Sequence, residues 1–289
     1  MLKKITYFVY ILLFFFDKIF QKLTKKSIFD WLNYFIEQNA YLKKKILKKK
    51  VTFFCPNYLV KWRVETLFTK EPDTLSWIDN FEKGKVFWDI GANIGIYSIY
   101  AAIKLKKKIE IIAFEPSTSN TRILSRNVSI NNLEEVIKIF PIGLSNREGF
   151  FKIFENEFIE GVSLNSLGEK INFEGKKFIS KNKYQLYGNS IDNLLSKKIL
   201  KFPSYIKIDV DGLEHVILKG AENKLLKNDN IVSVLVEINE SYKEQFITTN
   251  KIMKKNNFKL INKSRNAFSD PKDKFYRTFN YIFEKKKYI

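Results

Sequence analysis

The stretch VFWDIGANIG, from Val86 to Gly95, decides the fold class of this chain. Its first four residues, Val86–Asp89, predict a short buried strand that ends on an acid. An apolar helical run begins at Ile94, and the tight turn before it is built from the small residues Gly91, Ala92, Asn93 and Gly95. Strand, glycine turn and helix in this order are typical of open α/β proteins that bind a nucleotide-like ligand at a strand end. Glycine suits such a turn because the backbone can bend sharply and a ligand can approach it closely.

The spacing within the stretch, D-x-G-x-N-x-G, narrows the kind of ligand. A dinucleotide site would favour G-x-G-x-x-G, and a P-loop would need G-K-[ST] after the glycines; this turn has neither. An acid beside a glycine turn suits a ligand that carries an ammonium group and a sugar diol, and S-adenosylmethionine has both. We therefore expect Asp89, Gly91, Asn93 and Gly95 to bind this cofactor, with Asp89 and Asn93 placing its methionine end. The alternative is an ordinary strand-to-helix turn in a domain that binds no ligand.

Two further positions extend this candidate cofactor site. Residues 109–114 predict the next strand, which ends on Glu115, where two carboxylate oxygens can accept hydrogen bonds from adjacent ribose hydroxyls. The alternative for Glu115 is an acid at a helix N-terminus, stabilised by the helix dipole. A helix over 118–130 and a strand over 136–142 follow, and the loop that contains Ser145 is expected at the same sheet edge, beside the adenine.

A cluster of acids follows another predicted buried strand, Tyr205 to Val210. We expect Asp209 or Asp211 to act as a base that activates a hydroxyl group, with Glu214 or His215 assisting. Asp211 and Glu214 have an alternative role as an acidic helix cap, and His215 as an ordinary helix residue. A second chemical option is Mg²⁺ held by oxygen ligands from Asp209, Asp211 and Glu237, the last of which ends the strand over 231–238.

The composition of the chain limits its partners. Lys and Arg number 51 against 31 Asp and Glu, a formal charge of +20, but only six of the basic residues are arginines. Arginine is the residue favoured for reading bases and for gripping phosphates, and the abundance of Lys, Asn, Ile and Phe matches an A/T-rich genome. We therefore expect no nucleic-acid partner. Cys55 is the only cysteine and His215 the only histidine, which excludes an internal disulfide or a zinc cluster.

Residues 1–50 are predicted to form a helical extension that precedes the main domain over 51–289. The run from Ile5 to Phe16 is almost entirely apolar, yet it is shorter than the ~20 residues that a spanning helix needs. No small-residue cleavage site follows it, so a signal peptide is not indicated. Residues 1–23 therefore predict either an interfacial helix on an anionic membrane or a helix packed on the domain or a second subunit. A second helix is predicted over 27–49, ended by the lysine run 43–50.

The rest of the chain alternates between strand and helix patterns. Two strands are predicted over 51–55 and 59–64 with a turn between them, and Asp73 or Thr74 is expected to cap a short helix. Residues 149–190 interrupt the alternation and predict an insertion of antiparallel strands that lines the substrate entrance. A capped short helix at 190–195, a helix after 240 and a closing antiparallel pair over 258–261 and 279–283 complete the pattern. This alternation predicts a doubly wound α/β sheet.

Several of these segments, taken in order, resemble the FkbM-type family of S-adenosylmethionine-dependent methyltransferases. They are WRVETLFTKEPDTLSWIDNF, VFWDIGANIGIYSIYAA, IIAFEPS, IGLSNREG, SIDNLL, YIKIDVDGLEHVILKGAE and VLVEIN. The resemblance covers residues 56 to 285 and implies a class I methyltransferase fold, a Rossmann-like, mostly parallel sheet with an antiparallel last strand. It also implies transfer of a methyl group to a hydroxyl oxygen. Asp211 departs from the family pattern, which more often has Glu there.

The sequence as a whole thus predicts a cytoplasmic S-adenosylmethionine-dependent methyltransferase, with the inner face of the membrane as a second possible location. Its expected acceptor is a hydroxyl on a sugar, a glycan or another small metabolite. The rival hypothesis is a membrane-surface binding protein built on an inactive nucleotide-binding fold. Its support is the N-terminal helix and the charge of +20.

Overall fold

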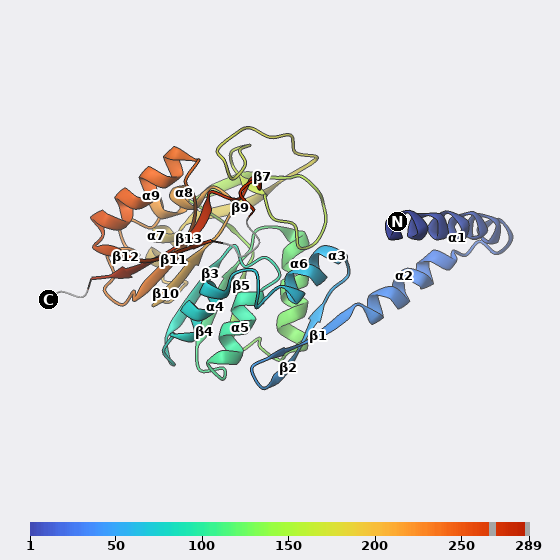
Figure 1. Ribbon diagram of the computed structural model, residues 1–289, viewed down its shortest axis with the longest axis horizontal. Coiled ribbons are helices and arrows are strands. Elements are labelled where there is room, and N and C mark those ends of the chain that lie inside the picture. The colour runs from blue at the N-terminus through green and yellow to red at the C-terminus, as the bar shows by residue number, and fades with distance from the viewer. Residues whose placement is uncertain (266–269, 287–289) are drawn as a thin grey trace.

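The computed structural model describes residues 1–265 and 270–286, and a seven-stranded sheet forms its centre (Figure 1). The strands, in spatial order, are β12 (Phe258–Arg265), β13 (Thr278–Lys285), β11 (Ser233–Asn239), β10 (Tyr205–Ile208), β3 (Val86–Ile90), β4 (Glu110–Phe114) and β5 (Ile137–Phe140). The five strands from β11 to β5 are parallel, whereas β13 pairs antiparallel with both of its neighbours. The predicted doubly wound sheet with an antiparallel closing pair is therefore confirmed.

Helices cover both faces of this sheet. One face carries α4 (Pro72–Asp79), α5 (Ile96–Lys104) and α6 (Thr118–Ile130), and the other carries α7 (Ile191–Ser196), α8 (Glu214–Lys219) and α9 (Lys243–Lys255). Side chains along each strand alternate between the two apolar layers, as Phe87 and Trp88 do on β3. Because both faces are buried, the central strands are almost wholly apolar, which is why the sequence showed them so clearly.

The insertion supplies three strands of a second sheet, and β6 (Gly143–Ser145), which lies just before the insertion, supplies the fourth. The strands of this sheet, in spatial order, are β6, β9 (Asn182–Ser190), β7 (Gly149–Glu155) and β8 (Ser166–Leu167). β7 pairs antiparallel with β8 and β9, as expected for this segment, while β6 and β9 are parallel. The short helix α7 begins as predicted, because the Ser190 side chain accepts a hydrogen bond from the Asn193 N–H.

The structure corrects the prediction for residues 27–55. The second helix, α2 (Ile28–Asn39), ends ten residues earlier than expected, and the lysine run belongs to a hairpin of β1 (Tyr41–Ile46) and β2 (Lys49–Phe54). The loop between these strands has Leu47 at φ 53°, a conformation that Gly or Asn usually adopts, so no residue type there signals a turn. Ile46 and Phe53 enter the domain core, so the helical extension is shorter than the expected residues 1–50.

Two smaller predictions in the next segment were also wrong. Residues 59–64 form the helix α3 (Tyr58–Glu65) rather than a strand, because Asn57 caps its start by accepting from the Val60 N–H at 2.9 Å. Neither Asp73 nor Thr74 is the N-cap of α4; that position is Glu71, followed by Pro72 at the first turn. The helix α1 (Leu2–Thr24) precedes all of these elements, and no helix in the described residues is long and apolar enough to cross a membrane.

Candidate active site

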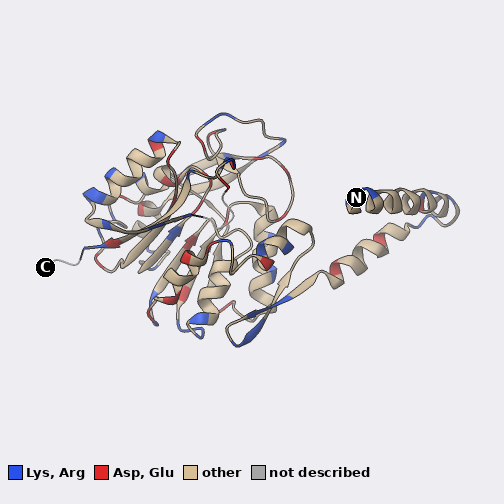
Figure 2. Ribbon diagram, in the orientation of Figure 1, with Lys and Arg blue, Asp and Glu red and all other residues tan. Residues whose placement is uncertain are grey.

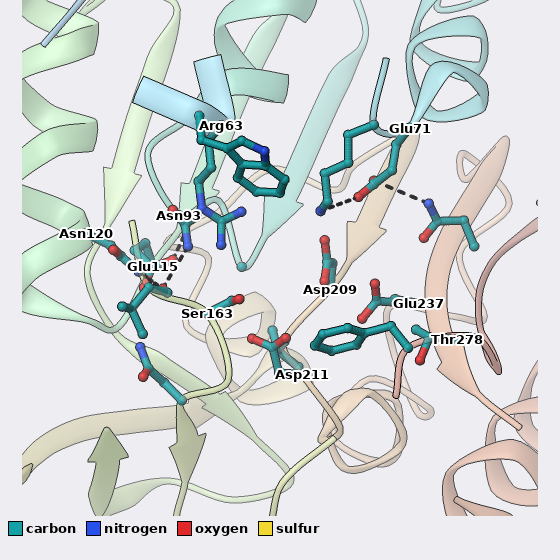
Figure 3. A pocket seen from close by; sticks show the side chains of 18 of the residues that line it. Arg63, Glu71, Asn93, Glu115, Asn120, Ser163, Asp209, Asp211, Glu237 and Thr278 are labelled. Atoms are coloured by element: carbon teal, nitrogen blue, oxygen red, sulfur yellow. Dashed lines mark hydrogen bonds and ion pairs between the residues drawn. The ribbon is translucent and has the colours of Figure 1, made fainter. Parts of the chain in front are cut away.

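A cavity of about 340 Å³ lies at the carboxyl edge of the central sheet (Figure 3). The ends of β3, β4, β10 and β11 form its floor, and the segment after α3, the insertion and the residues before β13 form its walls. In an open α/β sheet this edge is where ligands bind. Of the residues singled out in the sequence, six line the cavity: Gly91, Asn93, Glu115, Asp209, Asp211 and Glu237.

The glycine turn after β3 forms one side of the cavity. Gly91 has φ 82°, and a Cβ there would lie 1.8 Å from the carbonyl oxygen of Asp209, so only glycine fits between the two strand ends. Asn93 has φ 51°, and its N–H donates to Glu115 Oε2 at 2.7 Å. Its Oδ1 is buried and has no hydrogen-bond partner in the described part of the chain. A residue that lines the cavity thus carries an unused hydrogen-bond acceptor.

Glu115 is held rigidly by its own backbone neighbours. The N–H groups of Asn93 and Ser117 donate to its two carboxylate oxygens at 2.7 and 2.9 Å. Each oxygen keeps a second lone pair that can accept from a ligand. Burial raises the pKa of Glu115 to about 7, against the opposing effect of those two N–H groups. The prediction that this acid lies at the ligand edge of the sheet is consistent with its position in the cavity wall.

The structure does not place three of the expected cofactor residues in the cavity wall. Asp89 is only 1% exposed and lies beneath the turn, where its Oδ2 accepts from Ser98 Oγ at 2.6 Å. Gly95 packs against the Leu124 side chain of α6. Ser145 is buried, and its backbone lies against Gly220, where a Cβ would approach the Ser145 oxygen to 2.2 Å. These three residues therefore pack behind the cavity wall and do not line the cavity.

Three carboxyl groups from two strand ends share the cavity, but their surroundings differ (Figure 3). Asp209 forms an ion pair with the buried Lys207 at 2.6 Å. Asp211 has φ 59°, a strained conformation of the kind found at functional sites, and its Oδ2 accepts from the Leu164 N–H at 2.7 Å. Burial, followed by the charge of Asp209, raises the pKa of Asp211 to about 6. For Glu237, burial and the charges of Asp209 and Asp211 raise the pKa well above the ordinary value.

Glu214 and His215 lie outside this group of acids. Glu214 is fully buried and accepts hydrogen bonds from the Val210 and Gly212 N–H groups and from the Gln245 side chain. It therefore fixes the loop that carries Asp211 rather than facing the cavity, and the helix α8 has Leu213 as its N-cap, with no capping hydrogen bond from a side chain. His215 is also buried, with its Nε2 3.7 Å from Glu244, and it does not line the cavity.

A loop of the insertion, residues 161–165, forms a wall of the cavity beside the glycine turn. Asn93 and Asn120 both donate from their side-chain amides to the Val162 carbonyl at 3.0 Å. Arg63 Nε donates to the Gly161 carbonyl at 2.6 Å, and the bond from Leu164 to Asp211 fastens the other end of the loop. The insertion thus contributes to the cavity wall, as its sequence suggested, and the same loop contacts both the glycine turn and the acids.

Sequence reasoning missed the residues that reach the cavity from distant segments. They are Arg63, Lys70, Glu71, Asn120, Asn165, Thr278 and Asn280. Lys70 pairs with Glu71 at 2.7 Å, and Glu71 accepts further bonds from Tyr97 and Asn280 at 2.9 and 3.3 Å. Arg63, Lys70 and Glu71 lie in the segment WRVETLFTKEP, whose resemblance to the FkbM-type family is the one sequence signal for them.

The Mg²⁺ option gains no support from this geometry. Within residues 1–265 and 270–286, no group of three or more His, Cys, Asp or Glu side chains is placed so that it could hold a metal ion. Asp209, Asp211 and Glu237 share the cavity without forming such a set. Lys207 supplies the positive charge beside Asp209.

Comparisons with known proteins found a matching family model and related methyltransferases. A family model described as the methyltransferase FkbM domain matches residues 89–260. The hexuronic acid methyltransferase AglP of Haloferax volcanii is 26% identical over 187 residues, with 65% of this chain and 70% of that protein covered. The methyltransferase sdnD of Sordaria araneosa is 27% identical over 171 residues, with 51% of this chain and 64% of that protein covered.

One solved structure from the same comparisons carries the same family description. A crystal structure of methyltransferase FkbM from Methylobacillus flagellatus KT superposes with a TM-score of 0.48 and 16% identity. The superposition covers 71% of this chain and 44% of that one.

Proposed function

The chain belongs to the methyltransferase FkbM domain family, and from this premise we propose that it transfers a methyl group from S-adenosylmethionine to a hydroxyl oxygen of a sugar, a glycan or another small metabolite. The observation that carries the proposal is that one cavity holds the glycine turn and Glu115 on one side and three carboxyl groups on the other. We call these the donor side and the acceptor side. A two-substrate reaction needs both in one space.

The residues of the donor side fit the cofactor in chemical character. The buried Oδ1 atoms of Asn93 and Asn165 have no partner within the described residues, and such acceptors match the ammonium, amino and hydroxyl groups of S-adenosylmethionine. Glu115 retains lone pairs for the ribose diol. A neighbouring hollow lined by Pro116, Ile142, Leu144, Val210 and other apolar residues suits the adenine.

Arg63 is the residue that we assign to the methionine carboxylate. It lines both the main cavity and a small adjoining hollow beside the glycine turn. Its Nε is occupied by the Gly161 carbonyl, which leaves the two terminal nitrogens available for a bidentate contact. Asp89, buried beneath the turn, acts on this end only through the turn and Ser98.

On the acceptor side we propose that Asp211 takes the proton from the acceptor hydroxyl. The sulfonium of S-adenosylmethionine, when bound, supplies an electrophilic methyl group. Asp211 suits the role of base because its pKa of about 6 makes it more basic than an ordinary Asp while leaving it ionised at neutral pH. Asp209 is the weaker candidate, since its carboxylate is already neutralised by Lys207. For Glu237, burial and the neighbouring acids raise the pKa well above its ordinary value, which favours the protonated form and suits it to donate a hydrogen bond to an acceptor oxygen.

The carbohydrate class of acceptor is supported by the relative that acts on a hexuronic acid. A cavity rich in carboxyl and amide groups also suits a hydroxyl-rich molecule, because each hydroxyl can find both a donor and an acceptor. Labelled methyl transfer to a panel of uronic acids, neutral sugars and simple alcohols would test this class. Transfer to nitrogen alone would contradict the proposal.

Cofactor binding is tested by titrating S-adenosylhomocysteine into the purified chain. At 100 times its dissociation constant, the ligand should stabilise the fold by about 2.7 kcal/mol, seen as a rise in Tm. Glu115→Gln should weaken binding by roughly 10- to 100-fold, since it alters a charged hydrogen-bond acceptor. The exposed Glu134→Gln serves as the matched control and should leave affinity unchanged. The absence of a thermal shift would favour the rival binding-protein hypothesis.

A further inference from the structure

The largest feature outside the cavity is an arm formed by residues 1–39, which consists of α1 and α2. Figure 1 shows it extending away from the domain, with α2 leading outward and α1 folding back beside it. Asp17 fixes this shape, because its buried carboxylate accepts from the Ile28 N–H at 2.6 Å and from Ser27 Oγ. Phe29 completes the elbow by packing its ring edge-on to Tyr10 and Phe14. Contacts between its own side chains therefore hold the arm in a defined shape.

Apolar side chains are exposed around the whole circumference of α1. Eleven of the twelve residues from Ile5 to Phe16 are apolar or aromatic, and each of these eleven is between 40% and 64% exposed. Twelve consecutive helical residues point in every direction around the axis. A helix that is apolar on all sides is normally buried, yet beyond the contact of Phe29 with Tyr10 and Phe14 the described part of the chain leaves these apolar side chains largely exposed. Soluble proteins rarely expose so large an apolar patch without a binding role.

The charges and aromatic rings of the arm indicate what covers it. Six exposed lysines lie within residues 1–26 against the single acid Asp17, which is buried. They lie at the ends of the apolar run: Lys3 and Lys4 before it, and Lys18, Lys22, Lys25 and Lys26 beyond it toward the elbow. In Figure 2 the arm is mostly tan, with blue at its start and at the elbow. On α2, the exposed rings of Trp31, Tyr34 and Phe35 pack together.

The root of the arm is fastened to the domain. Glu37, near the end of α2, forms ion pairs at 2.6 Å with both Arg122 and Arg126 of α6. Arg126 also stacks on the Phe54 ring, with its guanidinium carbon 3.7 Å from the ring centroid. Whatever the arm binds is thus held at a defined side of the catalytic domain.

We propose that the arm binds the surface of an anionic lipid bilayer, with the apolar residues of α1 entering the boundary between headgroups and acyl chains. Lipid can cover a helix from several sides at once, whereas a second copy of the chain would cover only a stripe of it. The flanking lysines complement lipid phosphates, and Trp and Tyr are the residues that favour the membrane interface. The arm lies in the surface rather than crossing it, because α1 is too short in apolar length to span.

The test is co-sedimentation of the full chain with vesicles of phosphatidylcholine alone and of phosphatidylcholine with phosphatidylglycerol. We expect strong binding only to the anionic vesicles, decreasing as salt is raised. Phe8→Asp should lower the partition coefficient by at least ~10-fold, because burial of one Phe contributes about that much. Lys18→Gln combined with Lys22→Gln should lower it by about 25-fold, at roughly fivefold per lysine.

The matched control for Phe8→Asp is Phe150→Asp, at a Phe on β7 that is 72% exposed but far outside the arm in sequence. It should bind vesicles like the unaltered chain, and an unchanged thermal shift with S-adenosylhomocysteine would show that each variant is folded. Absence of vesicle binding, or equal binding by Phe8→Asp, would overturn the proposal. Sedimentation velocity without lipid tests whether a second copy of the chain covers α1 instead. If the chain formed a dimer that Phe8→Asp dissociates, and did not bind vesicles, the partner would be a second copy and the lipid proposal would be overturned.

Discussion

Both the donor side and the acceptor side of the cavity contain carboxyl groups, but different kinds of contact surround these groups on the two sides. On the donor side, Glu115 is fixed by N–H groups of the glycine turn and of its own following residues, all close to strand ends that the sequence marks. On the acceptor side, Asp209 is paired with Lys207, whereas burial and neighbouring charges raise the pKa values of Asp211 and Glu237. The position of Glu115 is thus set by nearby backbone, whereas the charge surroundings of the three acids depend on other strand ends.

The largest effect should follow from Asp211→Asn. Asparagine tolerates the positive φ of this position, so the fold should be retained while the proton acceptor is lost. We expect kcat to fall by roughly 10²- to 10⁴-fold, the usual contribution of a general base, with the S-adenosylhomocysteine dissociation constant nearly unchanged. Asp229→Asn, at an exposed position, is the control. A large loss of cofactor affinity in Asp211→Asn would break the division into two sides.

The next largest effect is expected for Glu214→Ala, which should lower the stability of the fold. The change leaves the buried N–H of Gly212 and the Gln245 amide without their acceptor. Each unsatisfied buried group costs about 1–3 kcal/mol, so the free energy of unfolding should fall by roughly 2–5 kcal/mol. Chemical denaturation measures this directly. If Glu214→Ala retained full stability but lost turnover, Glu214 would be catalytic and our structural assignment would be wrong.

The pH dependence of turnover should show the smallest effect, about tenfold per pH unit below the pKa of the base. Because the pKa of Asp211 is raised to about 6, its basic form is lost as pH falls through 6, whereas an ordinary Asp would stay ionised to about pH 4. Removing the charge of Asp209 should lower this pKa, so Asp209→Asn should move the acidic midpoint of kcat to lower pH. A midpoint that does not move would show that another group controls the profile.

The wrong predictions share a physical cause. The hairpin of β1 and β2 lacks the glycine or asparagine that normally marks its turn, and its lysines fit a solvated helix end equally well. Asn57 is both a turn former and a helix cap, so its neighbours decide between strand and helix. In each case local residue preferences allowed two structures, and packing against the domain core selected one.

The sheet, the glycine turn, the position of Glu115 and the cluster of acids after β10 could all be predicted from the amino-acid sequence. These features depend on residues close together in the chain, through apolar strand runs and the backbone freedom of glycine. Only the tertiary structure brought Arg63, Asn165 and Thr278 to the same cavity, and placed Asp89 and Glu214 behind it. The pKa values of Asp211 and Glu237 were likewise beyond the sequence, because they depend on burial and on charges supplied by other segments.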